Sequence, residues 1–571
     1  MTRSSARLAN KEQRPPAENI APKIEQSQKR VPSKVETARY PKRQKKETLA
    51  IKEEEPVRIV SKVVVPPTIV KSMPSSDLVP LYLTKLVDSY IPGNSSDYSV
   101  VANQTNPDFK PYHAMLNQTN LGQNNNKYFL IQVVKSKHGN YSTWFRWGRV
   151  GYPGQNDFSP CASLQAAIAK FEKKFNDKTL NSWDDIASGQ PFQPFPVKYT
   201  LIEAANDEAT ALLTIEPDAV EPDEPPPLVE TIHEEIQGFV KLICDRRAIE
   251  AELKEGFSFD SKRMPLGRLS SNTLTQALLV LTEVEASLNG PRSKLALLSS
   301  QFYTLIPHDF GFNKVSQFII DSVDKLREKA DLVEALASVE VANRLVIKKG
   351  ETSLTSLYDR LGVHLQPVLK GSDEWGVVEQ YQQTTHASTH NNYSCQIVRI
   401  LKLGHDDECN GRTLLWHGSR LSNWCSILKQ GLRIAPPEAP ATGYMFGKGV
   451  YFADCFSKSA NYCFVNSRGR GVIALCEVEL GESFICVDAD YNAGKKLGTK
   501  YHSVLAEGSS KPKDVKTIEN GRLKVPVGPL IKRGDSTRRS LLYNEYIVYD
   551  TSRVRMKYLV ELDFTPQESY F

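Results

Sequence analysis

The spacing of apolar residues changes twice along the chain, and no other feature limits its possible folds as strongly. The runs at 128–134 and 142–150 are typical of β-strands, and in the second run alternate residues share one face of the strand. From 229 to 350, apolar residues recur every three or four positions, which predicts a bundle of packed helices. From 351 onward the alternation returns, most strictly over 554–564. We therefore expect a multidomain α+β protein in which an all-α bundle separates a small α+β module from a β-rich domain.

The small module is expected at 96–205, and its surface combines aromatic and cationic side chains. Its second strand puts Phe145, Trp147 and Arg149 on one face, because side chains alternate along a strand. A helix is predicted to follow Ser163, since serine is a preferred residue just before the first helical turn. The outer face of this helix carries Lys170, Lys173, Lys174 and Lys178.

The N-terminal residues 1–95 are predicted to form a disordered basic tail. They are rich in Lys, Arg, Glu, Pro and Ser, so they cannot bury enough apolar surface to offset the entropy of ordering. Residues 1–50 have a net charge of +8, which leaves −2 of the total +6 for the other 521 residues. A compact basic cluster in the tail is interpreted as a nuclear import signal or a nucleic-acid-binding patch, with a solvated charge run as the alternative. The cluster consists of Lys42, Arg43, Lys45 and Lys46.

Several classes of protein are not expected from the composition. No apolar run approaches the roughly 18 residues of a membrane-spanning helix, and the apolar core of a signal peptide is missing. The nine cysteines include no Cys-x-x-Cys pair, which argues against a disulfide framework and a structural zinc site and favours a reducing compartment. His386 and His390 have the spacing of a metal-binding pair, but no acidic or Cys partner follows, so we expect no metal. The glycine motifs of Rossmann and P-loop nucleotide sites are also missing.

Three stretches of the β-rich domain contain residues that a plain strand pattern does not require. LLWHGSR at 414–420 joins a His, a Gly and a Ser at the end of a strand. GYMFGKGVYFAD at 443–454 combines glycines with aromatic rings, and YNEYIVY at 543–549 sets Glu545 in an otherwise apolar strand. Considered one at a time, each has a structural explanation: a satisfied His, a Tyr in the core, or a Glu paired with an Arg.

The order of these stretches carries more information than any one of them. With KSANY at 458–462 directly after the second stretch, they closely resemble the catalytic domain of the poly(ADP-ribose) polymerase family. MPLGR at 264–268 and FYTLIPHDF at 302–310 resemble the helical regulatory domain of that family. NNNK at 124–127 and WGR at 147–149 resemble its WGR domain.

The resemblance covers about residues 100–571 and implies a domain order. The chain resembles the smaller, DNA-dependent type of polymerase, which lacks zinc fingers. No Cys precedes position 161, so N-terminal zinc fingers are not expected. The implied parts are a tail at 1–95, a WGR-like DNA-binding domain at 96–205, an acidic proline-rich linker at 206–228, a helical regulatory domain at 229–350 and an ADP-ribosyltransferase domain at 351–571.

The resemblance also implies how NAD⁺, a consumed substrate and not a resident cofactor, would bind. The nicotinamide amide is expected on the backbone of Gly418 and the hydroxyl of Ser459. The nicotinamide ring is expected to stack on Tyr462, with Tyr451 closing the other side.

Four further residues have implied roles in the same reaction. His417 is expected to hold ribose hydroxyls, with Ser419 and Arg433 nearby. Glu545 is expected to accept a hydrogen bond from the nicotinamide-ribose 2′-OH and to stabilise the oxocarbenium-like transition state. His417, Tyr451 and Glu545 are thus the expected catalytic residues. The presence of Glu545 favours polymer over mono-ADP-ribose, because relatives that do not elongate carry another side chain there.

The WGR-like domain is expected to bind DNA strand breaks without sequence preference. Trp147 would offer a flat face to a terminal sugar or base, and Arg149, Lys127 and Asn126 would donate to phosphates. Break binding would release the helical domain from the NAD⁺ site. A nuclear, break-activated poly(ADP-ribose) polymerase follows, acting on proteins that include itself and histones, with a possible accessory factor and no membrane partner. The alternatives are a DNA-end-binding scaffold with a silent transferase fold and a mono-ADP-ribosyltransferase.

Overall fold

The computed structural model begins well inside the region expected to be a tail. Residues 79–95 are folded, so the prediction of disorder up to 95 is wrong for this part. Helix α1 (Val79–Lys85) leads to Asp88, whose carboxylate accepts a hydrogen bond of 2.8 Å from the Trp144 indole and pairs with buried Arg146. The sequence pattern missed this because the contact partners lie about 60 residues away. The described residues are 79–103, 110–202, 232–257, 269–346, 353–404, 411–441, 444–463, 465 and 469–567; the basic cluster at 42–46 and the linker at 206–228 lie outside them.

The WGR-like module is a twisted antiparallel sheet with the order β7-β6-β5-β4-β8, and β1 pairs with β5 beyond this path. Helix α2 (Leu164–Thr179) covers one face, and its N-terminus is capped by Ser163 as expected, with the Ser163 hydroxyl accepting from the Ala166 amide at 3.2 Å. The short helix α3 (Trp183–Ala187) packs against α2. The strands are β1 (Tyr98–Val100), β4 (His113–Asn120), β5 (Asn125–Ser136), β6 (Tyr141–Arg149), β7 (Gln155–Cys161) and β8 (Thr200–Leu201).

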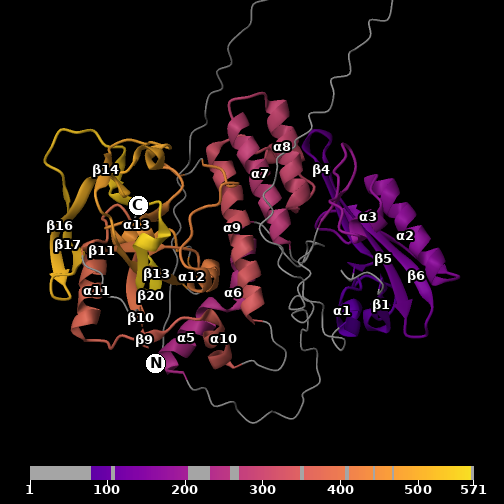
Figure 1. Cartoon of the computed structure of the whole chain (residues 1–571), viewed down its shortest axis with the longest axis horizontal. Helices are drawn as coiled ribbons and strands as arrows, with labels where there is room; N and C mark the ends of the chain where they lie inside the picture. The colour runs from indigo at the N-terminus through magenta and orange to yellow at the C-terminus, as the bar shows by residue number, and fades with distance from the viewer. Residues whose placement is uncertain are drawn as a thin grey trace, which may run out of the picture. The chain divides into compact units, whose positions relative to one another are not determined.

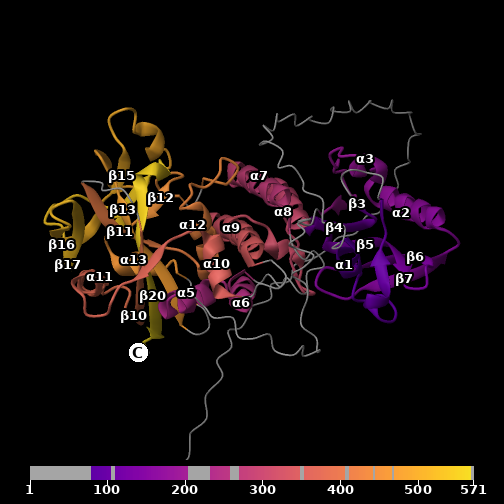
Figure 2. The ribbon, with the colours of Figure 1, turned by 60° about the horizontal axis from the view of Figure 1, so that its bottom comes forward.

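Most described residues of the regulatory region are helical, as predicted. Helices α7, α8 and α9 lie side by side, and α10 contacts α9 and α5 (Figures 1 and 2). Helix α9 begins at Val323, directly after Ser322, whose hydroxyl accepts a hydrogen bond from the Lys325 amide. The helices are α5 (Glu234–Ile243), α6 (Arg246–Phe257), α7 (Ser271–Ser287), α8 (Arg292–Leu305), α9 (Val323–Val346) and α10 (Leu354–Leu361).

The regulatory helices share apolar cores with both neighbouring domains. On one side, Leu281 and Phe302 of α7 and α8 belong to the same buried cluster as Trp144 of the WGR-like sheet. On the other side, Phe239 of α5 is buried in one cluster with Trp424 of the catalytic domain. The bundle is therefore packed between the two domains that the sequence predicts to bind DNA and NAD⁺.

The catalytic domain contains an eight-stranded sheet of order β18-β16-β17-β11-β13-β20-β10-β9 and a four-stranded sheet of order β12-β19-β15-β14. A bridge between Trp416 and Ala453 links the two sheets. The helices nearest the site are α12 (Trp424–Gln430) and α13 (Phe456–Ala460). The strands of the larger sheet are β9 (Leu365–Pro367), β10 (Tyr393–Leu403), β11 (Arg412–Gly418), β13 (Arg470–Val478), β16 (Gly508–Ile518), β17 (Leu523–Lys532), β18 (Leu541–Tyr543) and β20 (Val554–Pro566). Those of the smaller sheet are β12 (Val450–Phe452), β14 (Ser483–Cys486), β15 (Ser503–Ala506) and β19 (Glu545–Val548).

The strand expected across 541–550 is in fact two strands. Tyr543, at the end of β18, pairs with Ser510 in the larger sheet, and Glu545, at the start of β19, pairs with Ala506 in the smaller sheet. Asn544 makes the break: its side chain accepts from the Gly508 amide at 2.9 Å and donates to Asp454 at 2.7 Å. Glu545 therefore sits at the junction of the two sheets. The multidomain α+β class predicted from the sequence is confirmed.

Candidate active site and DNA interface

The end of β11 lies against α13 so closely that only glycine fits at 418. A Cβ atom on Gly418 would lie 1.8 Å from the carbonyl oxygen of Ser459. The hydroxyl of Ser459 is fixed by donating to the Trp416 carbonyl at 3.0 Å, which leaves its lone pairs free to accept. Gly418 and Ser459, which are far apart in sequence, thus meet as the two sides of one narrow backbone crevice.

His417 is held in a single orientation beside this crevice. Its Nδ1 donates to the carbonyl of Tyr451 at 2.9 Å, which leaves Nε2 as the acceptor nitrogen of a neutral ring. Burial lowers the pKa of His417, and the hydrogen bond to Tyr451 only partly opposes this effect. At neutral pH the residue is therefore an uncharged hydrogen-bonding group and not a cation.

Two tyrosines provide flat surfaces near His417. The hydroxyl of Tyr451 donates to the Gly447 carbonyl at 2.8 Å and accepts from the Phe446 amide at 3.0 Å. This ring is thereby fixed by the loop that precedes it, and burial raises the pKa of its hydroxyl far above the ordinary value. Tyr462, just after α13, keeps 44% of its surface exposed. The pair combines one rigid ring and one accessible ring.

Glu545 faces a cation that the sequence analysis did not assign. Lys458 of α13 places its Nζ 2.9 Å from the Glu545 carboxylate and also donates to the Tyr543 carbonyl at 2.8 Å. Both side chains are only about 15% exposed, at 16% for Lys458 and 15% for Glu545. The available signal was the position of Lys458, directly before Ser459 in the KSANY stretch.

A buried carboxylate supports the strand break that presents Glu545. Asp454 is 2% exposed and accepts hydrogen bonds from Asn544 at 2.7 Å and from the Tyr546 hydroxyl at 3.0 Å. Burial raises the pKa of Asp454, and these two donors oppose the rise. Since Asn544 and Tyr546 flank Glu545 on both sides, Asp454 orients the strand and is a second residue that the sequence analysis did not assign.

Helix α9 of the regulatory region lines the same site. Arg327 hydrogen-bonds Tyr462, and Glu334, two turns farther along the helix, lies within the electrostatic reach of Arg420 and Arg433. Glu334 keeps solvent-exposed surface, and desolvation by the surrounding protein raises the pKa of its carboxyl. Two of the residues expected to bind NAD⁺, Tyr462 and Arg433, thus face the regulatory bundle. Apolar periodicity alone gave no indication of this polar face of α9.

Ser419 lies next to this contact. Its hydroxyl accepts a hydrogen bond of 3.1 Å from Asn423, at the start of α12. Arg433, which follows α12, is exposed. The structure therefore brings together expected NAD⁺ residues from β11, β12, α13 and β19 and adds Lys458 and Asp454, while Arg433 is linked to this group through Glu334 of α9.

Three protein-family models match this chain in the order that the motifs predicted. They are the WGR domain at 112–190, the poly(ADP-ribose) polymerase regulatory domain at 230–361 and the poly(ADP-ribose) polymerase catalytic domain at 372–564. Poly [ADP-ribose] polymerase 2 of Arabidopsis thaliana is 40% identical over 501 residues, which cover 84% of this chain and 77% of the plant protein. The chain belongs to the poly(ADP-ribose) polymerase family.

Similarity to other members of the family follows the same pattern. Poly [ADP-ribose] polymerase 2 of Homo sapiens is 39% identical over 473 residues, covering 79% of each chain. Poly [ADP-ribose] polymerase 1 of Gallus gallus is 35% identical over 481 residues, which cover 81% of this chain but only 46% of the longer protein. The identification made from the motifs is confirmed, and the catalytic domain is that of an ADP-ribosyltransferase that uses NAD⁺ as its substrate.

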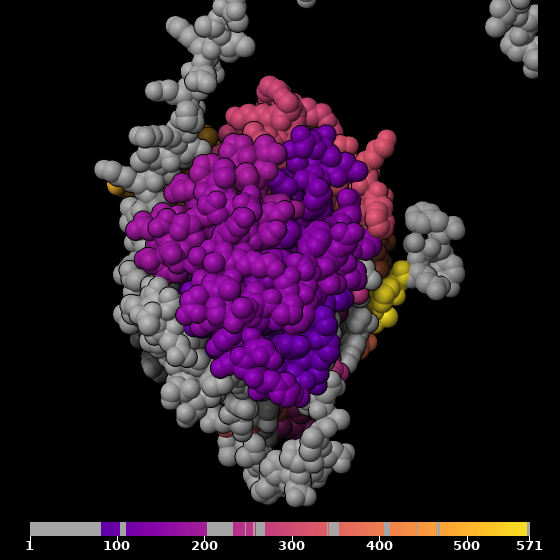
Figure 3. All heavy atoms as spheres, turned by 90° about the vertical axis from the view of Figure 1, so that its right-hand side faces the viewer, coloured from indigo at the N-terminus to yellow at the C-terminus, as the bar shows by residue number. Residues whose placement is uncertain are grey.

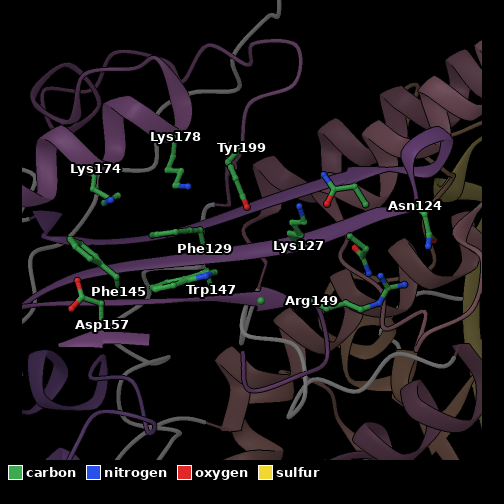
Figure 4. Close-up of a pocket in the computed structure, with 13 residues that line it drawn as sticks. Asn124, Lys127, Phe129, Phe145, Trp147, Arg149, Asp157, Lys174, Lys178 and Tyr199 are labelled. Atoms are coloured by element: carbon green, nitrogen blue, oxygen red, sulfur yellow. The ribbon is translucent and has the colours of Figure 1, made fainter. Parts of the chain in front are cut away.

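The residues expected to contact DNA surround an open trough of about 500 Å³ on the WGR domain (Figure 4). Trp147 stacks on Phe129 of the neighbouring strand, with ring centroids 5.5 Å apart and planes within 10°. Lys127 lines the same trough beside them. The face of the molecule seen in Figure 3 consists mainly of this domain, coloured from indigo to magenta.

Two of the expected DNA contacts also hold the regulatory domain. Asn126 is fully buried, and its amide donates to the His308 carbonyl at 2.8 Å, so its side chain is already committed inside the protein. Arg149 donates from Nε to the Gly311 carbonyl, while its buried Nη2 has no hydrogen-bond partner among the described residues. The loop that contains His308 and Gly311 belongs to the regulatory region, so this poly(ADP-ribose) polymerase joins its candidate DNA interface directly to its regulatory helices.

Metal and membrane sites were also considered. Within the described part of the chain, no group of three or more His, Cys, Asp or Glu side chains is arranged to hold a metal ion. The Nε2 of His386 contacts the His390 carbonyl at 3.0 Å, and the Nδ1 of His390 contacts the Ser457 hydroxyl at 2.8 Å, so both rings have protein partners. None of the described helices combines the length and the apolar character needed to cross a membrane.

Proposed function

We propose that this chain is a DNA-break-activated poly(ADP-ribose) polymerase that transfers ADP-ribose from NAD⁺ to proteins and elongates it into polymer, with release of nicotinamide. The observation that carries the proposal is the Glu545–Lys458 pair at the sheet junction, because it sets one oriented carboxylate beside the crevice of Gly418 and Ser459. Membership of the family and the names of its relatives support the same activity.

In the proposed mechanism, the nicotinamide amide binds to the backbone of Gly418 and donates to the lone pairs of Ser459. The nicotinamide ring lies between Tyr462 and the fixed ring of Tyr451. The Nε2 atom of neutral His417 accepts a hydrogen bond from a ribose hydroxyl. Ser419 and Arg433 bind the rest of the dinucleotide. These contacts bind and orient the substrate and leave the glycosidic bond as the site of reaction.

Glu545 acts on the bond that breaks. Its carboxylate accepts a hydrogen bond from the 2′-OH of the nicotinamide ribose. Its negative charge stabilises the positive charge that develops on the sugar as nicotinamide leaves. The same carboxylate polarises the hydroxyl of an incoming acceptor during elongation. Lys458, at 2.9 Å, restricts the orientation of the Glu545 carboxylate.

Regulation follows from the contacts of α9 and of the loop around His308. While Arg327 bonds Tyr462 and Glu334 faces Arg433, α9 occupies space that NAD⁺ needs. A DNA end that binds Trp147 and Lys127 lies beside Arg149, the residue that also holds Gly311. Break binding and NAD⁺ binding are thereby coupled through the regulatory helices.

The proposed partners are DNA strand breaks and acceptor proteins that include the enzyme itself and histones, with an accessory factor as a further possible partner. We place the protein in the nucleus, with the cluster at 42–46 as the import signal. The positive charge of residues 1–50 would add non-specific DNA affinity that falls with salt. Recognition of the break itself is assigned to the WGR domain.

The function is tested by NAD⁺ consumption with and without duplex DNA that has 5′-phosphorylated ends. Such DNA is expected to raise the rate at least tenfold, and Trp147→Ala is expected to abolish most of this stimulation, since one stacked aromatic contributes about 1–3 kcal/mol to binding. Tyr141→Ala, at the opposite end of β6, is the matched control and keeps the stimulation.

Each other outcome points to a different function. Equal rates with and without DNA ends would contradict break activation. No NAD⁺ consumption under any condition would leave a DNA-end-binding scaffold, and products of only single ADP-ribose units would identify a mono-ADP-ribosyltransferase.

A further inference from the structure

Two lysines of α2 overhang the aromatic floor of the WGR trough, away from the residues assigned to the break itself. The Nζ of Lys178 lies 4.5 Å from the ring centroid of Phe129 and 5.6 Å from that of Tyr199. The Nζ of Lys174 lies 5.4 Å from the ring centroid of Phe145. In Figure 4 both side chains point from the helix toward the sheet. The trough therefore has cations above and aromatic rings below.

The charges around Lys178 favour an anionic occupant. Burial lowers the pKa of Lys178, and the nearby cations Lys174, Lys127 and Lys198 lower it further, while Asp177 opposes them. Like charges at this density repel one another, and a phosphate chain between them would relieve the repulsion. Asp157, on β7, is the carboxylate among the thirteen residues that line the trough.

The trough has the direction and length of a short single strand. Along β6, Arg149, Trp147 and Phe145 follow one another at intervals of two residues and point to the same face. At a rise of about 3.3 Å per residue, the path from Arg149 to Phe145 is about 13 Å. A volume of about 500 Å³ is ample for one or two nucleotides.

We propose that the trough between α2 and β6 binds one or two unpaired nucleotides that extend from the 5′ end at a DNA break, with the first base on Trp147 and the phosphates between Lys174 and Lys178. This inference rests on the proposed DNA-binding function and deepens it by naming the kind of break. The break end enters at Arg149, and the unpaired strand continues past Trp147 toward Phe145.

The charge of the trough selects the 5′ strand. An extension of either strand brings one more phosphate with every nucleotide, but only a phosphorylated 5′ extension ends in a phosphate dianion. A 3′ extension ends in an uncharged hydroxyl. Lysines spaced one turn apart on α2 match successive phosphates of a flexible strand, and bases of any identity can stack on an aromatic ring, so no sequence preference follows.

The test compares three fluorescent hairpin duplexes, each with a single free end: blunt, with a two-nucleotide 5′ extension, or with a two-nucleotide 3′ extension, all 5′-phosphorylated. Binding to the full-length protein is measured by anisotropy at several salt concentrations. The 5′-extended end is expected to bind about tenfold tighter than the blunt end, the scale of one stacked base. The 3′-extended end is expected to match the blunt end.

The matched variants are Lys178→Met and Lys173→Met, which remove one charge each from the same helix. Lys178→Met is expected to reduce the preference for the 5′ extension to less than threefold and to lower the salt dependence for that probe by about 0.7, the value for one single-strand phosphate contact. Lys173 is exposed on the outer face of α2. Lys173→Met is therefore expected to keep the wild-type preference for the 5′ extension.

Three results would overturn the inference: equal affinity of the wild-type protein for the blunt and 5′-extended ends, equal affinity for the two extensions, or equal weakening of all probes by both lysine variants. The last result would show that the lysines attract DNA only through their positive charge, without a specific contact to the 5′ extension. Failure of the proposed function gives a different pattern, in which no end binds or Trp147→Ala binds every probe as the wild-type protein does.

Discussion

Glu545→Gln is expected to abolish polymer formation and to slow NAD⁺ cleavage by about 100- to 1,000-fold, the usual cost of removing one preorganised charge-stabilising group. The amide keeps the shape of the side chain and can still accept a hydrogen bond from the ribose. It carries no negative charge for the developing sugar cation, and it leaves Lys458, at 2.9 Å, as an uncompensated cation beside that sugar. Because the contacts to nicotinamide come from other residues, the KM for NAD⁺ is expected to change far less than kcat.

The measurement is steady-state NAD⁺ consumption with saturating broken DNA, together with product length on a gel. Glu482→Gln is the control, since Glu482 forms an exposed ion pair with Lys500 at 3.2 Å outside the site. DNA affinity and the unfolding temperature of both variants should match the wild-type values. Long-chain product from Glu545→Gln at the wild-type rate would refute the role assigned to the carboxylate.

Loss of the contacts between α9 and the NAD⁺ site is expected to have the second-largest effect. The double change Arg327→Ala and Glu334→Ala removes the hydrogen bond to Tyr462 and the charge that faces Arg433. Since both side chains have exposed surface, their combined contribution is about 1–2 kcal/mol, and activity without DNA should rise about tenfold. Activity with saturating broken DNA should stay near the wild-type value.

The control for this variant is Asp324→Ala, which removes a charge from the first turn of the same helix. Rates are measured with and without 5′-phosphorylated ends, at one NAD⁺ concentration below the KM and one above it. A rise that appears only below the KM would locate the effect in NAD⁺ access. An unchanged DNA-free rate in the double variant would exclude α9 as the barrier.

The parts of the fold that the sequence predicted are those set by local pattern. Strand-like runs of residues were sufficient to predict β5 and β6, and Ser163 marked the start of α2, because strand faces and helix caps depend on residues only a few positions apart. The motifs around His417 and Glu545 were recognised as sequences. Their approach to each other required the pairing of β12 with β19 and the bridge between Trp416 of β11 and Ala453, which no local signal contains.

The parts that the sequence did not predict depend on contacts across long separations. Asn544 divides the expected strand by binding Gly508 and Asp454, 36 and 90 residues away. Asn126 looks like a phosphate ligand by residue type, but its amide binds the carbonyl of His308, 182 residues away. A polar residue that hydrogen-bonds a residue far away in the sequence cannot be distinguished, from its local sequence, from one that binds a ligand.

The sharing of apolar cores has a consequence for the cooperativity of unfolding. Among the described residues, the buried clusters of the regulatory helices each include side chains of another domain, as Phe302 does with Trp144 and Phe239 with Trp424. Unfolding of the regulatory helices therefore exposes apolar surface on both neighbouring domains. This exposure adds to the heat-capacity change of unfolding and couples the three domains. In a calorimeter, domains counted as three by sequence should give overlapping transitions, and a ligand of one should shift the melting of the others.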